Sequence, residues 1–181
     1  MRGLIFFILL AIGVDGFSQG IKYLPANINH RAKNNIFPAI SGDGKTMLFL
    51  SDYTNNEELG LMITKYVGGK WQDPKEVEGI GPESVNNIGG YSITNDGGAI
   101  WFSSRRPNGI GGYDIWYMNK SGNGWSRPVN PAIPLNSARH EGNPTISPDG
   151  ERVYFMVCSS ITRETSKGCK IYFSERNHMP G

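Results

Sequence analysis

The stretch Pro144-Thr145-Ile146-Ser147-Pro148-Asp149-Gly150 decides the fold, because the chain contains it twice more in related form. Its counterparts are Pro38-Ala39-Ile40-Ser41-Gly42-Asp43-Gly44 and Tyr91-Ser92-Ile93-Thr94-Asn95-Asp96-Gly97. The Asp-Gly step recurs with a constant spacing of 53 residues, from Asp43 to Asp96 and from Asp96 to Asp149. A fixed period of this order is typical of an array of repeated supersecondary units. The chain is therefore predicted to be a repeat protein.

Each copy has the pattern of a strand, a tight turn and a second strand. Short runs of Ile, Phe, Tyr and Trp flank the Asp-Gly step, where glycine supplies a positive φ and aspartate can accept a hydrogen bond from the backbone two residues on. This periodic placement puts each aspartate in a different unit. We therefore interpret six residues as structural turns rather than acids or ligands: Asp43, Gly44, Asp96, Gly97, Asp149 and Gly150.

Two landmarks with nearly the same spacing define three repeats. The second landmark is Trp-x-x-Pro, which begins at Trp71 and again at Trp125. Repeats are expected at 36–87, 88–140 and 141–181, and the last stops before its fourth strand. The strands are predicted at 37–41, 46–53, 59–67 and 74–78, at 90–94, 99–104, 113–119 and 126–130, and at 152–157 and 170–174. Each complete repeat thus predicts a four-stranded antiparallel meander.

The N-terminus has the pattern of a secretory signal peptide. Arg2 precedes an uncharged apolar run over 4–14, and the small residues Gly16 and Ser18 follow it. The alternative, a transmembrane anchor, needs roughly 20 apolar residues. We expect a signal peptide at 1–18 and a lead-in segment at 19–35 with a short strand at 21–24. The mature protein is accordingly predicted to be exported.

Composition favours an all-β chain. It contains 24 Gly and 11 Pro, which indicate many turns, and no segment keeps a sustained helical period. The formal charge is +2 and the basic residues are scattered, so no nucleic-acid surface is indicated. No pattern indicates a cofactor or a metal site.

The combined motifs resemble the WD-like propeller repeats of the TolB type. The likeness rests on Ile146-Ser147-Pro148-Asp149-Gly150, on Gly111-Gly112-Tyr113-Asp114-Ile115-Trp116 and on the Trp125-x-x-Pro128 step, and it covers about residues 34–176. It implies four-stranded blades around a central axis, in a protein of the bacterial envelope: periplasmic, outer-membrane associated or extracellular. Propellers close with typically four to eight blades. Three repeats leave the array open, so further blades must come from a longer chain, the alternative we favour, or from another chain.

Positions at which the repeats differ are the candidates for binding. Arg105 falls at the position of Asp52 and Cys158, and Asp114 at that of Gly60 and Lys170. One hypothesis makes Arg105, Arg106 and Asp114, with the glycine-rich loop 109–112, a rim contact to a partner, the arginines binding anionic groups. The alternative is an ion pair between Arg105 and Asp114 that holds the loop.

The two cysteines lie on either side of one predicted hairpin. Cys158 replaces Arg105 and Cys169 aligns with Tyr113, so a Cys158–Cys169 disulfide is predicted in the oxidising compartment that export implies. A metal site is the weaker alternative, because two cysteines fall short of a four-ligand set.

The resulting prediction is a non-enzymatic binding module that docks a protein or an envelope glycan on its blade loops. One alternative is a glycan-active or glycan-binding propeller, for which Glu83 and Glu141 are the candidate carboxylates. Another is the propeller domain of a serine peptidase that lacks its hydrolase domain. Trp71, Trp101, Trp116 and Trp125 are interpreted as blade core.

Overall fold

The computed structural model describes residues 20–52, 59–81, 90–162 and 165–176. Within these ranges the chain forms fourteen strands and no helix, and every strand pair is antiparallel. The prediction of an all-β fold is confirmed. None of the described segments is a helix with the length and apolarity that a membrane span requires. The predicted signal peptide at 1–18 and Glu83 lie outside the described residues.

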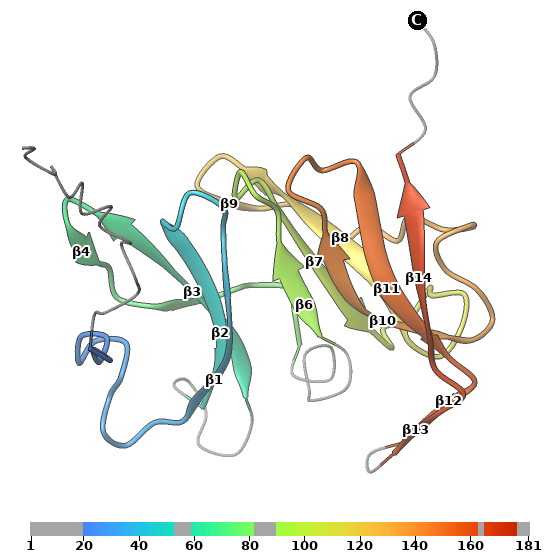
Figure 1. The fold of residues 1–181 in the computed structure, drawn as a ribbon, viewed down its shortest axis with the longest axis horizontal. Helices are drawn as coiled ribbons and strands as arrows, with labels where there is room; N and C mark the ends of the chain where they lie inside the picture. Colours follow the sequence, from blue (N-terminus) through green and yellow to red (C-terminus); the bar gives the residue numbers. More distant parts are fainter. Residues whose placement is uncertain (1–19, 53–58, 82–89, 163–164, 177–181) are drawn as a thin grey trace, which may run out of the picture.

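Three sheets follow one another along the chain (Figure 1). The first contains β1 (Asn35–Ile40), β2 (Thr46–Ser51), β3 (Gly60–Val67), β4 (Lys70–Trp71) and β5 (Lys75–Glu76), and both β4 and β5 pair with β3. The second contains β6 (Tyr91–Ile93), β7 (Ala99–Ser104), β8 (Asp114–Ser121) and β9 (Gly124–Trp125). The third contains β10 (His140–Ile146), β11 (Arg152–Cys158) and β14 (Lys170–Glu175), with a small hairpin of β12 (Ser160–Ile161) and β13 (Ser166–Lys167) beside it.

The predicted strands agree with the structure except at the edges of the sheets. The strand expected at 126–130 contributes only an isolated bridge between Tyr117 and Val129. The strand expected at 21–24 is wrong for this structure, since these residues belong to no sheet and Ile21 and Tyr23 are exposed. Edge strands have few local signals, because their pairing depends on a neighbour rather than on their own sequence.

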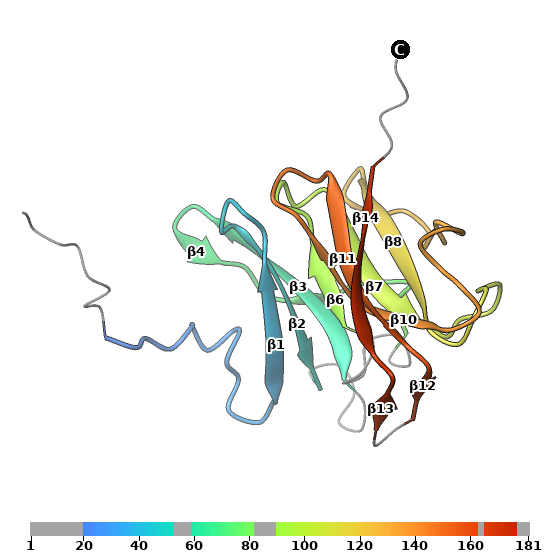
Figure 2. The same ribbon diagram turned by 45° about the vertical axis from the view of Figure 1, so that its right-hand side comes forward.

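The antiparallel order gives the array two distinct faces. Figure 1 shows the three Asp-Gly turns along the upper edge and the connections that follow β2, β7 and β11 along the lower edge. We call these the turn face and the loop face. Figure 2 shows the three sheets side by side in an open array.

The hydrophobic core lies between successive sheets rather than inside one. Leu48 and Leu61 of the first sheet share a buried cluster with Ile93, Ile100 and other residues of the second sheet. A separate cluster joins Ile115 of the second sheet to Val153 and Phe155 of the third sheet. Each sheet therefore buries its apolar face only where another sheet covers it.

A residue with positive φ occupies the same repeat position in β1 and β10 and directly before β6. Phe37, Gly90 and Asn143 are 53 residues apart and have positive φ angles of 54°, 69° and 50°. The register of β1 shifts between Ile36 and Ala39, and that of β10 shifts between Gly142 and Thr145, as in a β-bulge. At the first of these positions the Tyr91 hydroxyl donates a hydrogen bond to the Phe37 carbonyl, which joins the first two sheets.

Candidate interaction surfaces

The three Asp-Gly turns have the same hydrogen-bond pattern. In the second sheet Asp96 Oδ1 accepts from the Thr94 hydroxyl at 2.6 Å and from the Gly98 amide at 2.8 Å. Asp43 accepts in the same way from Ser41 and Lys45, and Asp149 from Ser147 and Glu151. The following glycines have φ angles of 69°, 68° and 76°, a conformation that other residues rarely adopt.

These hydrogen bonds keep the turn carboxylates ionised. The Thr94 hydroxyl, followed by the Gly98 amide, lowers the pKa of the Asp96 carboxyl. The equivalent hydroxyls, Ser41 and Ser147, lower the pKa of Asp43 and Asp149. A carboxylate with a lowered pKa is a poor proton donor near neutral pH. Each of the three carboxylates is thus bonded within its own turn, as the interpretation of these residues as turn residues requires.

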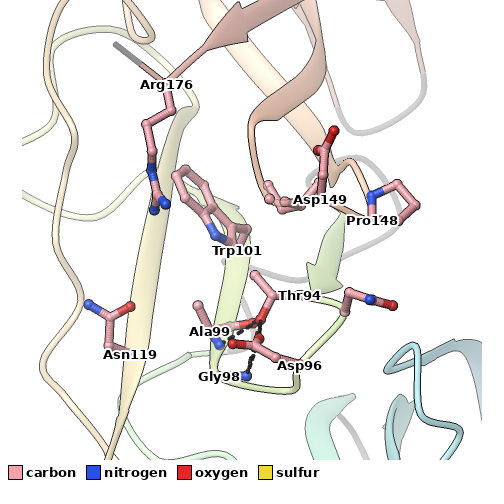
Figure 3. A pocket seen from close by; sticks show the side chains of 12 residues that line it. Thr94, Asp96, Gly98, Ala99, Trp101, Asn119, Pro148, Asp149 and Arg176 are labelled. Atoms are coloured by element: carbon pink, nitrogen blue, oxygen red, sulfur yellow. Dashed lines mark hydrogen bonds between the residues drawn. The ribbon is translucent and has the colours of Figure 1, made fainter. Parts of the chain in front are cut away.

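A pocket of about 350 Å³ lies on the turn face between the second and third sheets (Figure 3). Asp96 and Asp149 line it with their turns, and Trp101, Asn119 and Arg176 complete its wall. The Trp101 ring stacks on Tyr117 with 4.9 Å between ring centroids. From the sequence, Trp101 is interpreted as a core residue. In the structure it also forms part of the wall of this pocket.

The loop between β7 and β8 is folded around Asp114. This side chain is 1% exposed and accepts hydrogen bonds from the Ile110 amide at 2.5 Å and the Gly111 amide at 3.1 Å. Asn130 Nδ2 also lies within hydrogen-bond distance, at 3.3 Å. A buried carboxylate with three donors fixes the path of the loop and is not available to a partner.

Arg105 contacts an aromatic ring instead of a carboxylate. Its guanidinium carbon lies 4.7 Å from the centroid of the Tyr113 ring. No ion pair joins Arg105 to Asp114 in the described part of the chain. The β7–β8 register explains this difference, because Asp114 lies opposite Ser104, which places Tyr113 across from Arg105.

Arg106 connects the first two sheets. Its Nη2 donates to the Gly79 carbonyl at 3.1 Å and its Nε to the Ser104 hydroxyl at 3.2 Å. The guanidinium also lies over the rings of Phe102 and Trp116, at 4.9 and 5.2 Å. Of the two arginines, Arg105 is the more exposed and Arg106 is engaged inside the array.

The same loop packs on the segment that leads into the third sheet. The Gly112 amide donates to the Arg139 carbonyl at 2.8 Å, and the Tyr113 amide to His140 Nδ1 at 3.2 Å. A Cβ atom on Gly112 would lie 2.1 Å from the His140 ring, so the contact requires glycine. The C-terminal end of the loop is therefore held against the segment that leads into β10.

Glu141, the second candidate carboxylate, is an internal contact. It is 1% exposed, and it accepts hydrogen bonds from the Ser137 hydroxyl at 2.5 Å and the Ser137 amide at 3.2 Å. In the described ranges, no three His, Cys, Asp or Glu side chains are grouped as a metal site would require.

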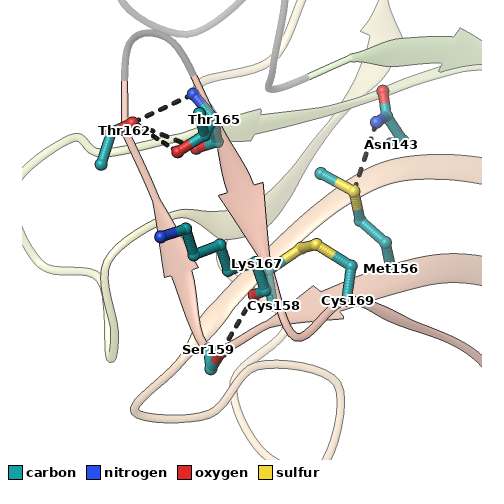
Figure 4. The surroundings of a disulfide bond; sticks show 8 residues. All are labelled: Asn143, Met156, Cys158, Ser159, Thr162, Thr165, Lys167 and Cys169. Atoms are coloured by element: carbon teal, nitrogen blue, oxygen red, sulfur yellow. Dashed lines mark hydrogen bonds between the residues drawn. A yellow bond between two sulfur atoms is a disulfide. The ribbon is translucent and has the colours of Figure 1, made fainter.

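Cys158 and Cys169 are bonded at the base of the β12–β13 hairpin (Figure 4), with 2.03 Å between the sulfur atoms. Beyond the bond, the Ser159 amide and hydroxyl both donate to the Lys167 carbonyl, at 3.1 and 2.9 Å. Cys158 is fully buried and shares a cluster with Tyr113 and Ile161. The disulfide thus packs against the aromatic ring that Arg105 covers.

A solved structure with the same arrangement identifies the fold. A putative TolB from Agrobacterium tumefaciens matches 78% of this chain and 46% of its own, with a TM-score of 0.54 and 17% sequence identity. The chain has a TolB-type β-propeller fold. TolB from Acinetobacter baumannii matches 76% of this chain and 29% of its own, with a TM-score of 0.49 and 19% identity.

The TolB-type match therefore shows the fold and covers less than half of either solved protein. No protein-family model matches the chain, and no curated protein sequence does so either.

One signal in the sequence could have identified the contact between Arg105 and Tyr113. These two residues align with the two cysteines of the third repeat, so the period already places them across the same hairpin. The turn-face pocket has no such signal, because its walls come from two sheets.

Proposed function

We propose that the chain is a non-enzymatic interaction module of an exported envelope protein, and that its partner docks on the loop face. The observation that carries this proposal is the ordered loop 105–112. It exposes Arg105 and Ile110 while Asp114 and the segment around Arg139 fix its backbone.

A loop that is already ordered suits binding for a thermodynamic reason. Ordering a flexible loop during association costs free energy, and this cost is smaller when the loop is held beforehand. Ile110 of this loop is 41% exposed, and Arg105 and Arg139 are exposed as well. An apolar side chain with basic side chains around it is complementary to a protein surface that has an apolar centre and acidic groups around it. A neutral glycan offers no such charge complementarity, so a protein is the better match.

Three features support export to the periplasm, the outer membrane or the outside of the cell. Residues 1–18 have the pattern of a signal peptide. Disulfides such as Cys158–Cys169 persist in oxidising compartments. A solved structure that shares the fold is a putative TolB, although its sequence identity to this chain is 17%.

Glu141 does not favour the glycan-active alternative. Its carboxylate is buried and bonded to Ser137, whereas a catalytic carboxylate must reach a substrate. The serine-peptidase alternative concerns a hydrolase domain outside this chain and stays a prediction.

A charge reversal on each face tests the proposal. The immobilised protein is exposed separately to detergent-solubilised envelope proteins and to purified peptidoglycan, and retained material is identified and quantified by mass spectrometry. We expect Arg105→Glu to weaken retention of the partner at least about tenfold, which corresponds to about 1.4 kcal/mol. Lys45→Glu is the matched control, since Lys45 is an exposed basic residue on the turn face. Equal retention by the two variants contradicts the assignment to the loop face.

A further inference from the structure

The turn-face pocket continues into a second cavity. The pocket itself has a volume of about 350 Å³ and contains the turns of Asp96 and Asp149. The second cavity has a volume of about 240 Å³ and extends toward Leu135. Trp101 and Arg176 line both of them. The two cavities therefore form one depression between the second and third sheets, which we call the inter-sheet groove.

The first and second sheets meet without an aromatic side chain at the same repeat position. Trp101 pairs with Tyr117 across β7 and β8. The equivalent pair in the first sheet is Leu48 with Ile63. Leu48 is 0% exposed in the cluster that joins the first two sheets, whereas Trp101 is partly buried and lines both cavities. An aromatic pair thus borders the groove where the other junction has a closed aliphatic core.

The Trp101 ring is fixed in place before any ligand arrives. Tyr117 stacks on it with 4.9 Å between the ring centroids and 26° between the ring planes. The ring also packs on the cluster that contains Val153 and Phe155. A side chain that is already ordered loses little conformational entropy when it binds a ligand. The groove therefore has a pre-ordered aromatic wall.

Four polar side chains around this ring have atoms that are available for hydrogen bonds (Figure 3). Asp96 and Asp149 accept hydrogen bonds within their turns through Oδ1, and their Oδ2 atoms have no partner among the described residues. In the same part of the chain, Asn119 and Arg176 take part in hydrogen bonds only through their backbone. The groove thus combines acceptors from two carboxylates with donors from an amide and a guanidinium.

This combination favours a neutral ligand with hydroxyl groups. The two carboxylates attract a cation but Arg176 repels it, and for an anion the two effects are reversed. A hydroxyl group both donates and accepts, so it can donate to a carboxylate and accept from a guanidinium. Saccharides have such hydroxyl groups on a ring whose C–H groups can contact the negative face of an aromatic ring. A saccharide therefore matches both the polar groups and Trp101.

The second cavity has a more apolar wall. This wall contains Pro131, Pro134, Leu135 and Val153. Arg152 and Glu175 also line it, but they form an ion pair with each other at 2.8 Å. A hydroxyl group against an apolar wall would lose its hydration without a new partner, whereas a methyl group is stabilised there. The acetamido methyl of an N-acetylated amino sugar suits this cavity.

We propose that the inter-sheet groove binds an oligosaccharide that contains N-acetylated amino sugars. The hydroxyl groups of one sugar unit bond the four polar side chains around Trp101, and an acetamido methyl of the next unit lies in the second cavity near Leu135. This site lies on the turn face, so it does not depend on the partner proposed for the loop face.

Two disaccharides test the class of ligand. N,N′-diacetylchitobiose and cellobiose have the same linkage and differ in an acetamido group against a hydroxyl group on each ring. A ligand-observed NMR titration gives the dissociation constant of each. We expect diacetylchitobiose to bind at least about fourfold more tightly, as the burial of one methyl group predicts. Equal affinities overturn the assignment to N-acetylated sugars. Failure of both disaccharides to bind, or tighter binding of the cation agmatine, overturns the saccharide site.

A matched pair of variants tests the position of the site. Asp96→Asn keeps an oxygen for the hydrogen bonds of the turn but replaces the second acceptor by a donor. It is expected to raise the dissociation constant of diacetylchitobiose at least about tenfold, as the loss of a hydrogen bond to a charged group predicts. Asp43→Asn makes the same change in the first sheet, where the turn lines neither cavity, and is expected to bind like the wild type. Equal effects of the two substitutions overturn the proposal.

A third variant tests the aromatic wall. Trp101→Leu removes the ring, and Leu48 occupies the equivalent position in the first sheet, so the fold accommodates leucine there. This variant is expected to lose detectable binding of diacetylchitobiose while it keeps a cooperative thermal transition. If it does not fold, the pair Asp96→Asn and Asp43→Asn decides. Arg105→Glu, on the loop face, is expected to bind the sugar like the wild type, which separates this site from the surface of the proposed partner. Wild-type affinity in Trp101→Leu, or loss of binding in Arg105→Glu, overturns the proposal.

Discussion

The second and third sheets close the same hairpin position in different ways. In the second sheet the guanidinium of Arg105 lies over the Tyr113 ring at 4.7 Å. In the third sheet the residues at those two positions are Cys158 and Cys169, and they form a disulfide. The strand registers agree, because Ser104 faces Asp114 as Val157 faces Lys170. The same backbone geometry therefore accommodates either a non-covalent contact or a disulfide between these two positions. We call this cross-hairpin link the clip of each sheet.

The surroundings of the two hairpins explain the difference. Loop 105–112 is folded around the Asp114 carboxylate and packs on the segment near Arg139, so the clip is only one of several restraints. In the third sheet Lys170 replaces the aspartate, and the connection is longer, since Cys169 follows Cys158 at a sequence separation of 11. It extends as the β12–β13 hairpin. A longer connection gains more from a covalent closure, because closing it removes more conformational entropy from the unfolded chain.

Removal of the disulfide is expected to have the largest effect. Opening an 11-residue loop should reduce the free energy of unfolding by about 3 kcal/mol, because the unfolded chain regains conformational entropy. The double variant Cys158→Ala and Cys169→Ala is measured by chemical denaturation next to the reduced wild type, which loses the same bond without losing sulfur atoms from the cluster. A loss below about 1 kcal/mol in both samples would show that packing alone closes this hairpin.

The contact between Arg105 and Tyr113 in the second sheet is expected to contribute less to the free energy of unfolding than the disulfide does. Arg105→Met keeps an unbranched side chain but removes the positive charge over Tyr113, and an exposed cation–π contact contributes about 0.5–1 kcal/mol. The same denaturation experiment measures it, with Arg127→Met as the control because Arg127 is also exposed. If the two methionine variants are equally stable, the contact between Arg105 and Tyr113 contributes nothing, and the other restraints, Asp114 and the segment near Arg139, hold the loop.

The period of the sequence predicted most of the fold because repeated turns depend on local chemistry. Serine or threonine, aspartate and glycine form the same turn in each copy, and the strands on either side follow from it. The alignment also placed Cys158 opposite Cys169. The predicted ion pair was not found because side chains alternate along a strand. Asp114 therefore points away from Arg105 and is buried, whereas Tyr113 is its neighbour.

Contacts between sheets could not be predicted in this way. Arg106 reaches the Gly79 carbonyl, 27 residues away, and the turn-face pocket combines Trp101 with Arg176. The burial of Leu61 and Ile115 likewise depends on the sheet that follows each of them. The period shows which positions are equivalent, while the packing of the array determines which of them are covered.

The smallest effect is expected for the first sheet, at the residue equivalent to Arg105 and Cys158. Asp52 stands where Arg105 and Cys158 stand in the other sheets, and it accepts hydrogen bonds from the Asn34 amide at 2.9 Å and from Asn34 Nδ2 at 2.7 Å. The Asn34 amide lowers the pKa of the Asp52 carboxyl. A carboxyl whose folded pKa lies below its unfolded value of about 3.9 stabilises the fold above that value, and the contribution is lost as the pH falls through the folded pKa.

Amide exchange can detect this small local effect. We expect the protection of the Asn34 amide, corrected for the intrinsic exchange rate, to decrease between about pH 5 and about pH 2 in the wild type. In Asp52→Ala, which removes the acceptor oxygen, it is expected to be low at every pH. The Ser159 amide beside the disulfide is the internal control, since its acceptor is the Lys167 carbonyl, which does not titrate. Constant protection of Asn34 across this range would mean that the carboxylate does not hold the first hairpin, and that the three sheets differ in more than the chemistry of their clips.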